Sequence, residues 1–394
     1  MLTPLDDTLW HQLPTTFDHV WTSDPRFFDR YWFAIYSQDG RVAIQITMGA
    51  YRNMNVLDGG AVMTVDGKQY NLRVSRSLDR NAQTECGPLR ITPVTPLEEF
   101  EIAIAPGAHG ISGSIRWRCV EPAHEEHPHY ERLHGRTVQD YRRFDQIGLA
   151  SGWMEAGGQR IEIADWWSCR DHSWGVRRGM GVPEPVTGPK VTLAEKGHVM
   201  SFLFFSTDAM SGHLLFERRG EDEAYTTGVV TERLTDLSEA VHVVQKIELA
   251  ADLHPGTRRF RTAQVRATFD GGKLLVMDLT AMGSAIAMQG LGYSGGYNDG
   301  RGLGAWRAQN HLESDVWDVS HPSKVVYPDG SQKEHWHRIQ PVGIKADFGG
   351  KTSNGTGSQT FTIAGRPPAW LEAGSEGTAT SAKTAKAAKA GCLG

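Results

Sequence analysis

The sequence has little cysteine, no long apolar run and little net charge. Its four cysteines, at positions 86, 119, 169 and 392, are scattered among 394 residues without any C-x-x-C spacing, which argues against a disulfide framework. No stretch approaches the roughly 20 consecutive apolar residues of a membrane helix. A formal net charge of −5 over this length gives no attraction to a polyanion. We therefore expect neither a membrane-spanning segment nor a nucleic-acid partner.

The amino-terminal segment lacks the features of a secretory signal. Acidic Asp6 and Asp7 stand where a signal peptide carries basic residues, and no apolar run follows them. We expect a cytoplasmic protein with reduced cysteines. Cys119 falls at an alternating apolar position, so we interpret it as a small buried side chain rather than a nucleophile.

Glycine and proline are plentiful and evenly spread. The 44 glycines and 18 prolines divide the chain into many short elements, as in hairpins. Apolar side chains recur at every second position over residues 42–48 and 111–119, which is typical of strands. Turn signals lie between such runs, at Gln38–Gly40, Val65–Gly67, Ala156–Gly158, Phe269–Gly272 and Tyr327–Gly330. The pattern predicts an all-β fold, and only residues 137–146 fit a helical turn as well as a strand.

The chain is longer than one hydrophobic core usually serves, which favours two domains. Residues 181–189 are rich in proline and glycine and form the best candidate boundary, although a functional loop would have the same composition. We predict β domains at residues 1–180 and 190–373. Residues 374–394 consist mostly of small and polar side chains with little to bury, which predicts a flexible tail.

Residues 165–179 concentrate the side chains that can carry chemistry. They contain two aspartates, one histidine, three tryptophans and three arginines. In a strand, Asp171 would lie on one face, and His172 and Trp174 on the other. A histidine beside an apolar wall can acquire a pKa suited to proton transfer. The alternative is structural: Asp171 and Arg177 would form a buried ion pair while the tryptophans fill the core.

The run Asp171–Arg177 resembles a signature of the AttH-like, carotenoid 1,2-hydratase (hydroxyneurosporene synthase) family. Residues 29–33, with the turn at residues 38–40, are similar to the opening strand of that family, and the similarity spans residues 29 to 216. The resemblance implies two tandem lipocalin-like β-sheet or barrel domains with an internal apolar cavity. It also implies a hydratase, dehydratase or cyclase that acts on hydrophobic polyene, terpenoid or aromatic molecules.

The hydratase branch uses a His-x-Trp pair and a later Tyr-x-Asp pair. His172 and Trp174 match the first pair. The second has no counterpart at its expected place, because residues 206–208 lack the tyrosine and the matching residues 297–299 lie far downstream in a glycine-rich stretch. This departure weakens the case for carotenoid hydration and leaves general acid catalysis open.

Hydration or cyclisation of an alkene needs a proton donor, a dry pocket and stabilisation of a cation. We expect Asp171 or His172 to donate the proton, and Tyr141 or His172 to act as base on a phenolic substrate. We expect Trp174 and Trp153 to line the cation, with Arg177 setting the charge of the acid or holding a polar end of the substrate. No cofactor is required by this chemistry.

Two other segments have competing interpretations. Residues 124–134 contain four histidines without zinc-protease spacing, so we interpret them as a solvated loop and predict no metal site. Residues 292–296 fit the G-x-S-x-G pattern around Ser294, but no helix can follow, which favours a loop that covers a cavity. His311 and Glu313 come after this loop and would share one strand face, which makes them candidates for substrate binding.

Two classes of function remain open from the sequence. The first is a cofactor-independent lyase (hydratase, dehydratase or cyclase) that acts on a hydrophobic small molecule. The second is a non-catalytic lipocalin-like carrier of such a ligand, which needs a cavity but no titratable groups in it. The sequence leaves a homodimer open and does not identify the substrate.

Overall fold

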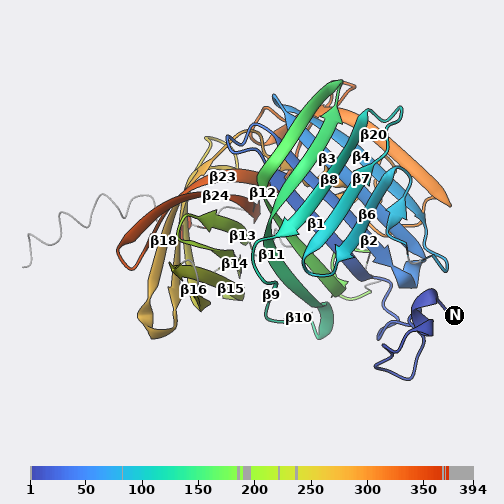
Figure 1. Ribbon diagram of the computed structural model, residues 1–394, viewed down its shortest axis with the longest axis horizontal. Helices are drawn as coiled ribbons and strands as arrows, with labels where there is room; N and C mark the ends of the chain where they lie inside the picture. Colours follow the sequence, from blue (N-terminus) through green and yellow to red (C-terminus); the bar gives the residue numbers. More distant parts are fainter. Residues whose placement is uncertain are drawn as a thin grey trace, which may run out of the picture. The chain divides into compact units, whose positions relative to one another are not determined.

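The computed structural model describes residues 2–81, 83–183, 187–189, 197–220, 222–235, 238–365, 368 and 370–371 (Figure 1). Nearly all regular structure in these residues is β-strand, with five short 3-10 helices before or between strands, and this confirms the predicted all-β class. The predicted tail at residues 374–394 lies outside the described residues, as do residues 184–186 of the predicted joint.

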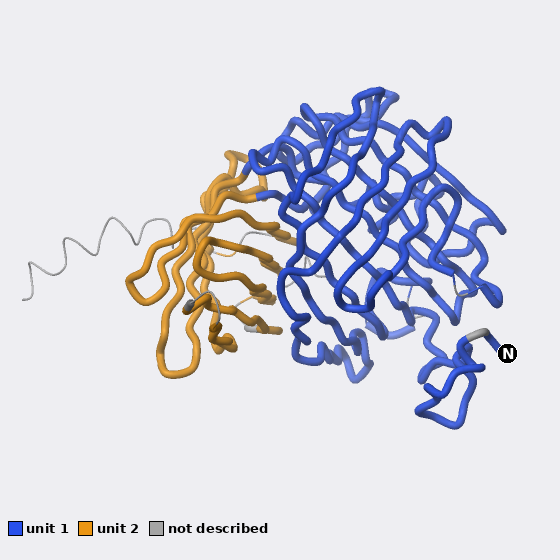
Figure 2. The backbone as a smooth tube through the Cα atoms, in the orientation of Figure 1, with its two compact units in different colours: residues 1–191, 282–341 blue, residues 192–281, 342–394 orange. Residues whose placement is uncertain are grey.

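The chain forms two compact units (Figure 2). Unit 1 comprises residues 1–191 and 282–341, and unit 2 comprises residues 192–281 and 342–394. The first break lies close to the proline- and glycine-rich joint at residues 181–189. Residues 282–341, which the sequence assigns to the second domain, belong to unit 1 because they pair with and cover its sheet.

Unit 1 is built on one 15-stranded sheet. The strand order along its main path is β22-β21-β20-β4-β3-β2-β1-β12-β11-β8-β7-β6-β5, with β9 and β10 paired to β11. The strands are β1 (Phe27–Tyr36), β2 (Ala43–Tyr51), β3 (Val56–Val65), β4 (Lys68–Ser77), β5 (Glu85–Cys86), β6 (Leu89–Thr95), β7 (Glu99–Ile104), β8 (Ile111–Cys119), β9 (His124–Glu125), β10 (His129–Leu133), β11 (Arg136–Ala156), β12 (Gln159–Arg177), β20 (Asn310–Asp318), β21 (Lys324–Val326) and β22 (Gln332–Glu334). Residues 137–146, ambiguous in the sequence, are part of the long strand β11.

All five predicted turns connect neighbouring strands. The turn between β3 and β4 has both central residues, Asp66 and Gly67, in the left-handed region, with φ of 50° and 77°. Such a turn matches the right-handed twist of the strands that it joins. Gly157 and Gly158 connect β11 and β12 in the same way, with φ of 59° and 77°. These turns fix the register of the hairpins that carry the candidate residues.

The sheet of unit 1 bends around an apolar core on one of its faces, here called the inner face. Side chains at alternating positions of β1, β2, β3, β8 and β11 enter this core, and β5 and β6 contact β3 across it. The ring of Phe33 on β1 lies 5.4 Å from that of Phe100 on β7 and 5.9 Å from that of Trp117 on β8. Burial of each such side chain contributes roughly 1.5–3 kcal/mol. The internal cavity that the resemblance implies stays a prediction.

The opposite, outer face of β1–β4 is covered by residues 282–305. Gln69 bonds to both backbone groups of Ala287, and the hydroxyl of Tyr297 donates to the carbonyl of Val74 at 3.0 Å. Ser294 lies in a 3-10 turn, Tyr293–Gly295, so the helix that a nucleophile elbow requires does not follow it. The glycine-rich segment therefore packs against the sheet.

Unit 2 is a closed antiparallel barrel. Its order is β18-β17-β16-β15-β14-β13-β24-β23, and a further pairing of β18 with β23 closes it. The strands are β13 (His198–Thr207), β14 (Met210–Arg219), β15 (Asp222–Thr235), β16 (Ser238–Leu253), β17 (Phe260–Phe269), β18 (Leu274–Ala281), β23 (Arg338–Phe348) and β24 (Lys351–Ala364), and the short β19 (Ile286–Ala287) pairs with the start of β23. Eight strands enclose an interior of about the width that side chains can fill, and buried apolar residues such as Leu203, Val265 and Phe361 occupy it. Closed barrel and large sheet agree with the predicted lipocalin-like architecture.

Among the described residues, no helix has the length and apolar character needed to cross a membrane. The cytoplasmic location and the homodimer stay predictions.

Candidate functional site

His172 lies on the inner face of β12 and is enclosed by aromatic side chains. In the register of the sheet it is opposite Tyr31 on β1 and Phe144 on β11. Its ring centroid is 4.6 Å from that of Tyr31, 5.2 Å from that of Phe144 and 5.4 Å from that of Trp174. Its Nε2 lies 2.7 Å from Oδ1 of Asp29. We call these five residues the His172 site.

The His172 site lies where the inner face reaches solvent. The side chains of His172 and Asp29 are 22% and 50% exposed, whereas Arg170, the next residue on the same face, is 1% exposed. A molecule can therefore contact the imidazole at the end of an apolar core without crossing the sheet.

The bond to Asp29 assigns roles to the two imidazole nitrogens. A carboxylate only accepts hydrogen bonds, so Nε2 of His172 donates to Asp29. Nδ1 has no hydrogen bond within the described part of the chain and is the atom that can exchange a proton with a bound molecule. The rings of Tyr31, Phe144 and Trp174 lie beside the imidazole and can stabilise a cation.

Arg170 lies beneath the His172 site and is held by a neutral side chain. Its Nε and Nη2 both donate to Oε1 of Gln146, at 3.0 and 2.7 Å. Gln146 is fixed in turn, because its Nε2 donates to the carbonyls of Leu97 and Glu121. The guanidinium thus has one fixed orientation.

Aromatic rings surround the same guanidinium. Its central carbon lies 4.6 Å from the ring centroid of Phe100 and 5.1 Å from those of Trp117 and Phe144. Burial lowers the pKa of Arg170 to about 10. Its Nη1 is buried without a hydrogen-bond partner, and Arg170 has no ion pair with a described carboxylate.

The predicted catalytic residues Asp171 and His172 lie on opposite faces of β12. Asp171 is half-buried on the face that also carries Arg177, and burial raises the pKa of its carboxyl group while Arg143 and Arg177 oppose the shift. Arg177 stacks on the rings of Phe28 and Tyr141, at 4.8 and 5.8 Å. The structure therefore unites His172 with Trp174 and separates both from Asp171, Tyr141 and Arg177.

Tyr141 is buried on the outer face in a hydrogen-bonded group. Its hydroxyl lies 2.8 Å from Nδ1 of His129 and 3.0 Å from Nη2 of Arg143, which donates to it. His129 comes from the histidine-rich segment, so part of that segment is tied to β11 rather than solvated. A role of Tyr141 as base stays a prediction.

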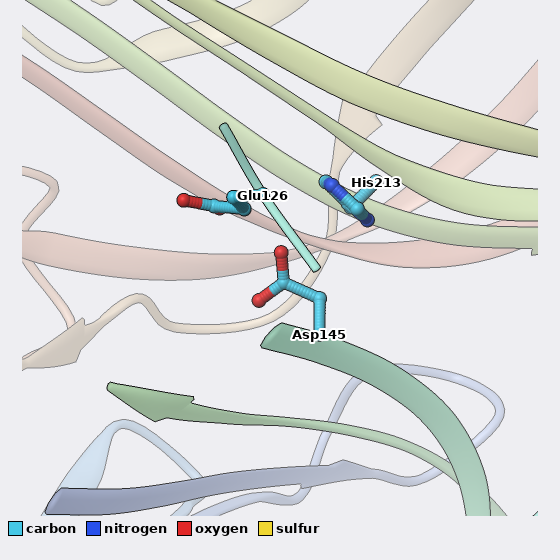
Figure 3. A group of neighbouring side chains, drawn as sticks. All are labelled: Glu126, Asp145 and His213. Atoms are coloured by element: carbon cyan, nitrogen blue, oxygen red, sulfur yellow. The ribbon is translucent and has the colours of Figure 1, made fainter. Parts of the chain in front are cut away.

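Asp145 and Glu126 are two buried carboxyl groups that the sequence analysis missed (Figure 3). Burial and the neighbouring carboxylate of Glu126 raise the pKa of Asp145 well above its usual range. Glu126 forms an ion pair with Arg143 at 3.2 Å. A sequence pattern could have placed Asp145 beside Arg143: Tyr141, Arg143 and Asp145 are at alternating positions, which puts all three on one strand face.

Trp153 lies far from His172. It is opposite Glu162 in the hairpin of β11 and β12, and Arg160 stacks on its ring at 4.1 Å. Nine residues of the same strand separate it from Phe144, which corresponds to roughly 30 Å. Trp153 is therefore outside the His172 site.

His311 and Glu313 share one face of β20, as expected, with 2.8 Å between Nε2 of His311 and Oε1 of Glu313. Glu313 also pairs with the buried Arg73 at 3.3 Å and accepts a hydrogen bond from the backbone N–H of Asn298 at 2.9 Å. These bonds tie the glycine-rich segment to the sheet. Their role in substrate binding stays a prediction.

Three members of the His172 site, Asp29, Tyr31 and Phe144, had no predicted role, and neither had Arg170 beneath it. The two segments that carry the family resemblance are neighbouring antiparallel strands, with Asp29 opposite Trp174 and Tyr31 opposite His172. Each segment could be recognised in the sequence, but the pairing of the two strands could not be predicted from it.

The fold and the site define a protein of two lipocalin-like β units with a histidine–carboxylate pair at the end of an apolar core. Residues 2–342 match the family described as "Family of unknown function (DUF8625)", and the chain belongs to that family. None of the curated proteins matches the sequence.

Several solved structures are similar to this chain. One is described as a "putative AttH" from Nitrosomonas europaea, with 10% identity, a TM-score of 0.49, and coverage of 85% of this chain and 92% of that one. Another is CghA with Sch210972, at 9% identity, a TM-score of 0.40, and coverage of 86% and 89%. The AttH-like and carotenoid hydratase parts of the resemblance stay predictions. At these identities the similarity concerns the fold and assigns no activity.

Proposed function

We propose that the protein is a cofactor-independent acid-base catalyst of the lyase or cyclase type, acting on a hydrophobic small molecule at the His172 site. The observation that carries this proposal is the 2.7 Å bond between His172 and Asp29 inside a set of aromatic rings. A histidine that only fills a core needs no carboxylate partner, and one that only forms a surface ion pair needs no aromatic enclosure.

The proposed reaction begins with proton transfer from Nδ1 of protonated His172 to an electron-rich carbon of the substrate. This step leaves neutral imidazole and a carbocation, which faces the rings of Trp174 and Phe144. In hydration, water adds to the cation and its surplus proton returns to Nδ1. In cyclisation or isomerisation, the cation loses a proton from carbon to Nδ1 instead. Each route restores the imidazolium, so no cofactor is consumed.

Asp29 acts in this proposal as a positioning residue. Its carboxylate accepts the hydrogen bond of Nε2 and so fixes the orientation of the ring, which leaves Nδ1 available to a bound molecule. Proton transfer by a positioned side chain commonly contributes roughly 10²- to 10⁴-fold, and loss of Asp29 should remove part of this contribution.

The experiment incubates the purified protein with a panel of apolar alkenes and phenols and follows the gain or loss of one water, or isomerisation at constant mass, by chromatography with mass detection. His172→Gln and Asp29→Asn are compared with Trp153→Leu, whose site lies far away along β11. The proposal predicts turnover by the wild type and Trp153→Leu and loss of turnover in His172→Gln. Ligands that bind to the wild type and are never converted would support a carrier and contradict catalysis.

A further inference from the structure

We propose that the molecule bound at the His172 site carries an anionic oxygen, a carboxylate or an enolate, that binds to Nη1 of Arg170. This inference rests on the proposed function for the location of the site. It adds the chemical class of the substrate, an apolar body with one anionic group.

The starting observation is a buried cation to which no described carboxylate is directly bonded, since Asp171 and Asp145 act on it only from beyond ion-pair distance. A buried guanidinium normally has a carboxylate partner, because desolvation of an unpaired charge costs several kcal/mol. Four of the other buried arginines of unit 1 have a carboxylate partner: Arg26 pairs with Asp24, Arg30 with Asp58, Arg73 with Asp315 and Arg143 with Glu126. The fifth, Arg338, donates to four backbone carbonyls instead. Arg170 has only the neutral amide oxygen of Gln146.

The orientation of the guanidinium is the second observation. Gln146 takes the Nε and Nη2 edge, and three aromatic rings lie near the guanidinium carbon. The donor that remains is Nη1, which is buried without a partner. A fixed guanidinium with a free N–H edge is the arrangement that binds carboxylate and similar oxygen anions, and a nearby apolar wall strengthens that attraction.

The distance to His172 constrains the ligand. Arg170 and His172 are two residues apart on the same face of β12, which corresponds to about 7 Å along the strand. An anionic oxygen at Nη1 would therefore place the carbon atoms a few bonds away beside the imidazole. Tyr31 and Phe144 line the same stretch of the inner face, so the intervening part of the ligand must be apolar.

The inference also explains why a costly group is tolerated. Replacing a buried unpaired charge by an apolar side chain of similar length is commonly neutral or stabilising. Here the charge lies at the edge of an apolar core, next to a histidine–carboxylate pair. Groups that lower stability are commonly kept where function requires them.

The test uses two matched pairs of probes, 2-naphthoate with 2-naphthylmethanol and decanoate with decanol, titrated into the full chain by calorimetry. We expect the wild type to prefer each acid over its alcohol. In Arg170→Met we expect the affinity for the acids to fall roughly 10- to 100-fold and that for the alcohols to change less than about threefold. Arg116→Met, an exposed arginine of β8 that pairs with Glu99, is the control and should leave both affinities unchanged.

Stability provides the second readout. We expect the melting temperature of Arg170→Met to stay close to that of the wild type, because relief of the buried charge offsets the loss of the two hydrogen bonds to Gln146. If this variant fails to fold, Arg170→Lys, which keeps the charge but loses the planar fork, replaces it and should lower the affinity for the acids. The absence of a preference for acids in the wild type, or an equal loss for acids and alcohols in the variants, overturns the inference. Full turnover in Arg170→Met together with no turnover in His172→Gln would overturn it and leave the proposed function standing.

Discussion

Asp171 and His172 are adjacent in the chain, yet their side chains lie on opposite faces of β12. His172 contacts Tyr31, Phe144 and Asp29 on the inner face. Asp171 lies among the arginines of the outer face, with Arg143 and Arg177. The alternation of a strand thus divides the family-like signature into two sets of side chains, and only one set can contact a given bound molecule.

The glycine of this signature allows close packing of β11 against β12. Gly175 has φ of +132°, and a Cβ there would lie 2.4 Å from the carbonyl oxygen of Asp140 and 2.6 Å from Cα of Tyr141. We predict that Gly175→Ala lowers the free energy of unfolding by roughly 2–4 kcal/mol, because both the backbone and its neighbours must shift. Urea unfolding followed by fluorescence measures this.

Gly158→Ala is the matched control for that prediction. Gly158 also has a positive φ, +77°, but nothing lies within 4 Å of its added Cβ. Its substitution should cost only the conformational penalty, about 1 kcal/mol. Equal losses in the two variants would contradict the packing argument.

The buried ion pair of Arg30 and Asp58 provides a second prediction. Nη1 of Arg30 lies 2.7 Å from Oδ1 of Asp58, and the other oxygen of Asp58 accepts a hydrogen bond from the N–H of Gly304 at 2.6 Å. Asp58→Leu should lower the free energy of unfolding by about 3–5 kcal/mol, because it leaves a buried cation. Faster amide hydrogen exchange at Gly304 should accompany the loss.

The double variant Arg30→Met/Asp58→Leu tests the cause of that loss. It removes both charges, so we expect it to recover at least half of the stability lost in Asp58→Leu. Amide exchange at Gly304 should stay fast, since its acceptor is still absent. A double variant as unstable as the single one would assign the loss to packing instead of charge.

Because His335 is buried, we predict that the free energy of unfolding depends on pH. Burial, followed by the charges of Arg338 and Lys333, lowers the pKa of His335 from its ordinary value of 6.5 to about 4. Between these values the unfolded chain binds a proton that the folded chain excludes. Stability should therefore fall as the pH decreases from 6.5 to 4, by up to about 3 kcal/mol from this residue.

His335→Gln retains a hydrogen-bonding group near Tyr327, whose hydroxyl lies 2.6 Å from Nε2 of His335, and removes the titration. The variant should show a smaller loss of stability over this pH range than the wild type in urea unfolding at a series of pH values. Identical pH profiles would show that other groups cause the dependence.

The all-β class and the turns could be predicted because both are local in sequence. Alternation marked β2 and β8, and left-handed glycines and aspartates marked the hairpins at Asp66–Gly67 and Gly157–Gly158. The period of two also predicted that His172 and Trp174 share a face. These properties need no knowledge of which strands are neighbours.

The composition of the site could not be predicted, because it depends on pairing between distant strands. Asp29 contacts His172 across 143 residues of sequence, and nothing in either segment specifies the other as its neighbour. Trp153 was chosen as a tryptophan on a nearby segment, although the length of β11 carries it away from the site. A role for Arg170 could not be predicted for a similar reason. Whether a buried arginine has a directly bonded carboxylate is known only when all of its neighbours in the fold are known.

We propose that proton transfer to the substrate occurs on the inner face of unit 1, at His172. The most direct measurement compares turnover of one converted substrate by His172→Gln and Asp171→Asn, two substitutions in adjacent residues with similar small changes in volume. We predict a loss of at least about 10²-fold in His172→Gln and less than about threefold in Asp171→Asn. The reverse result, with Asp171→Asn inactive and His172→Gln active, would contradict the account and move the chemistry to the outer face.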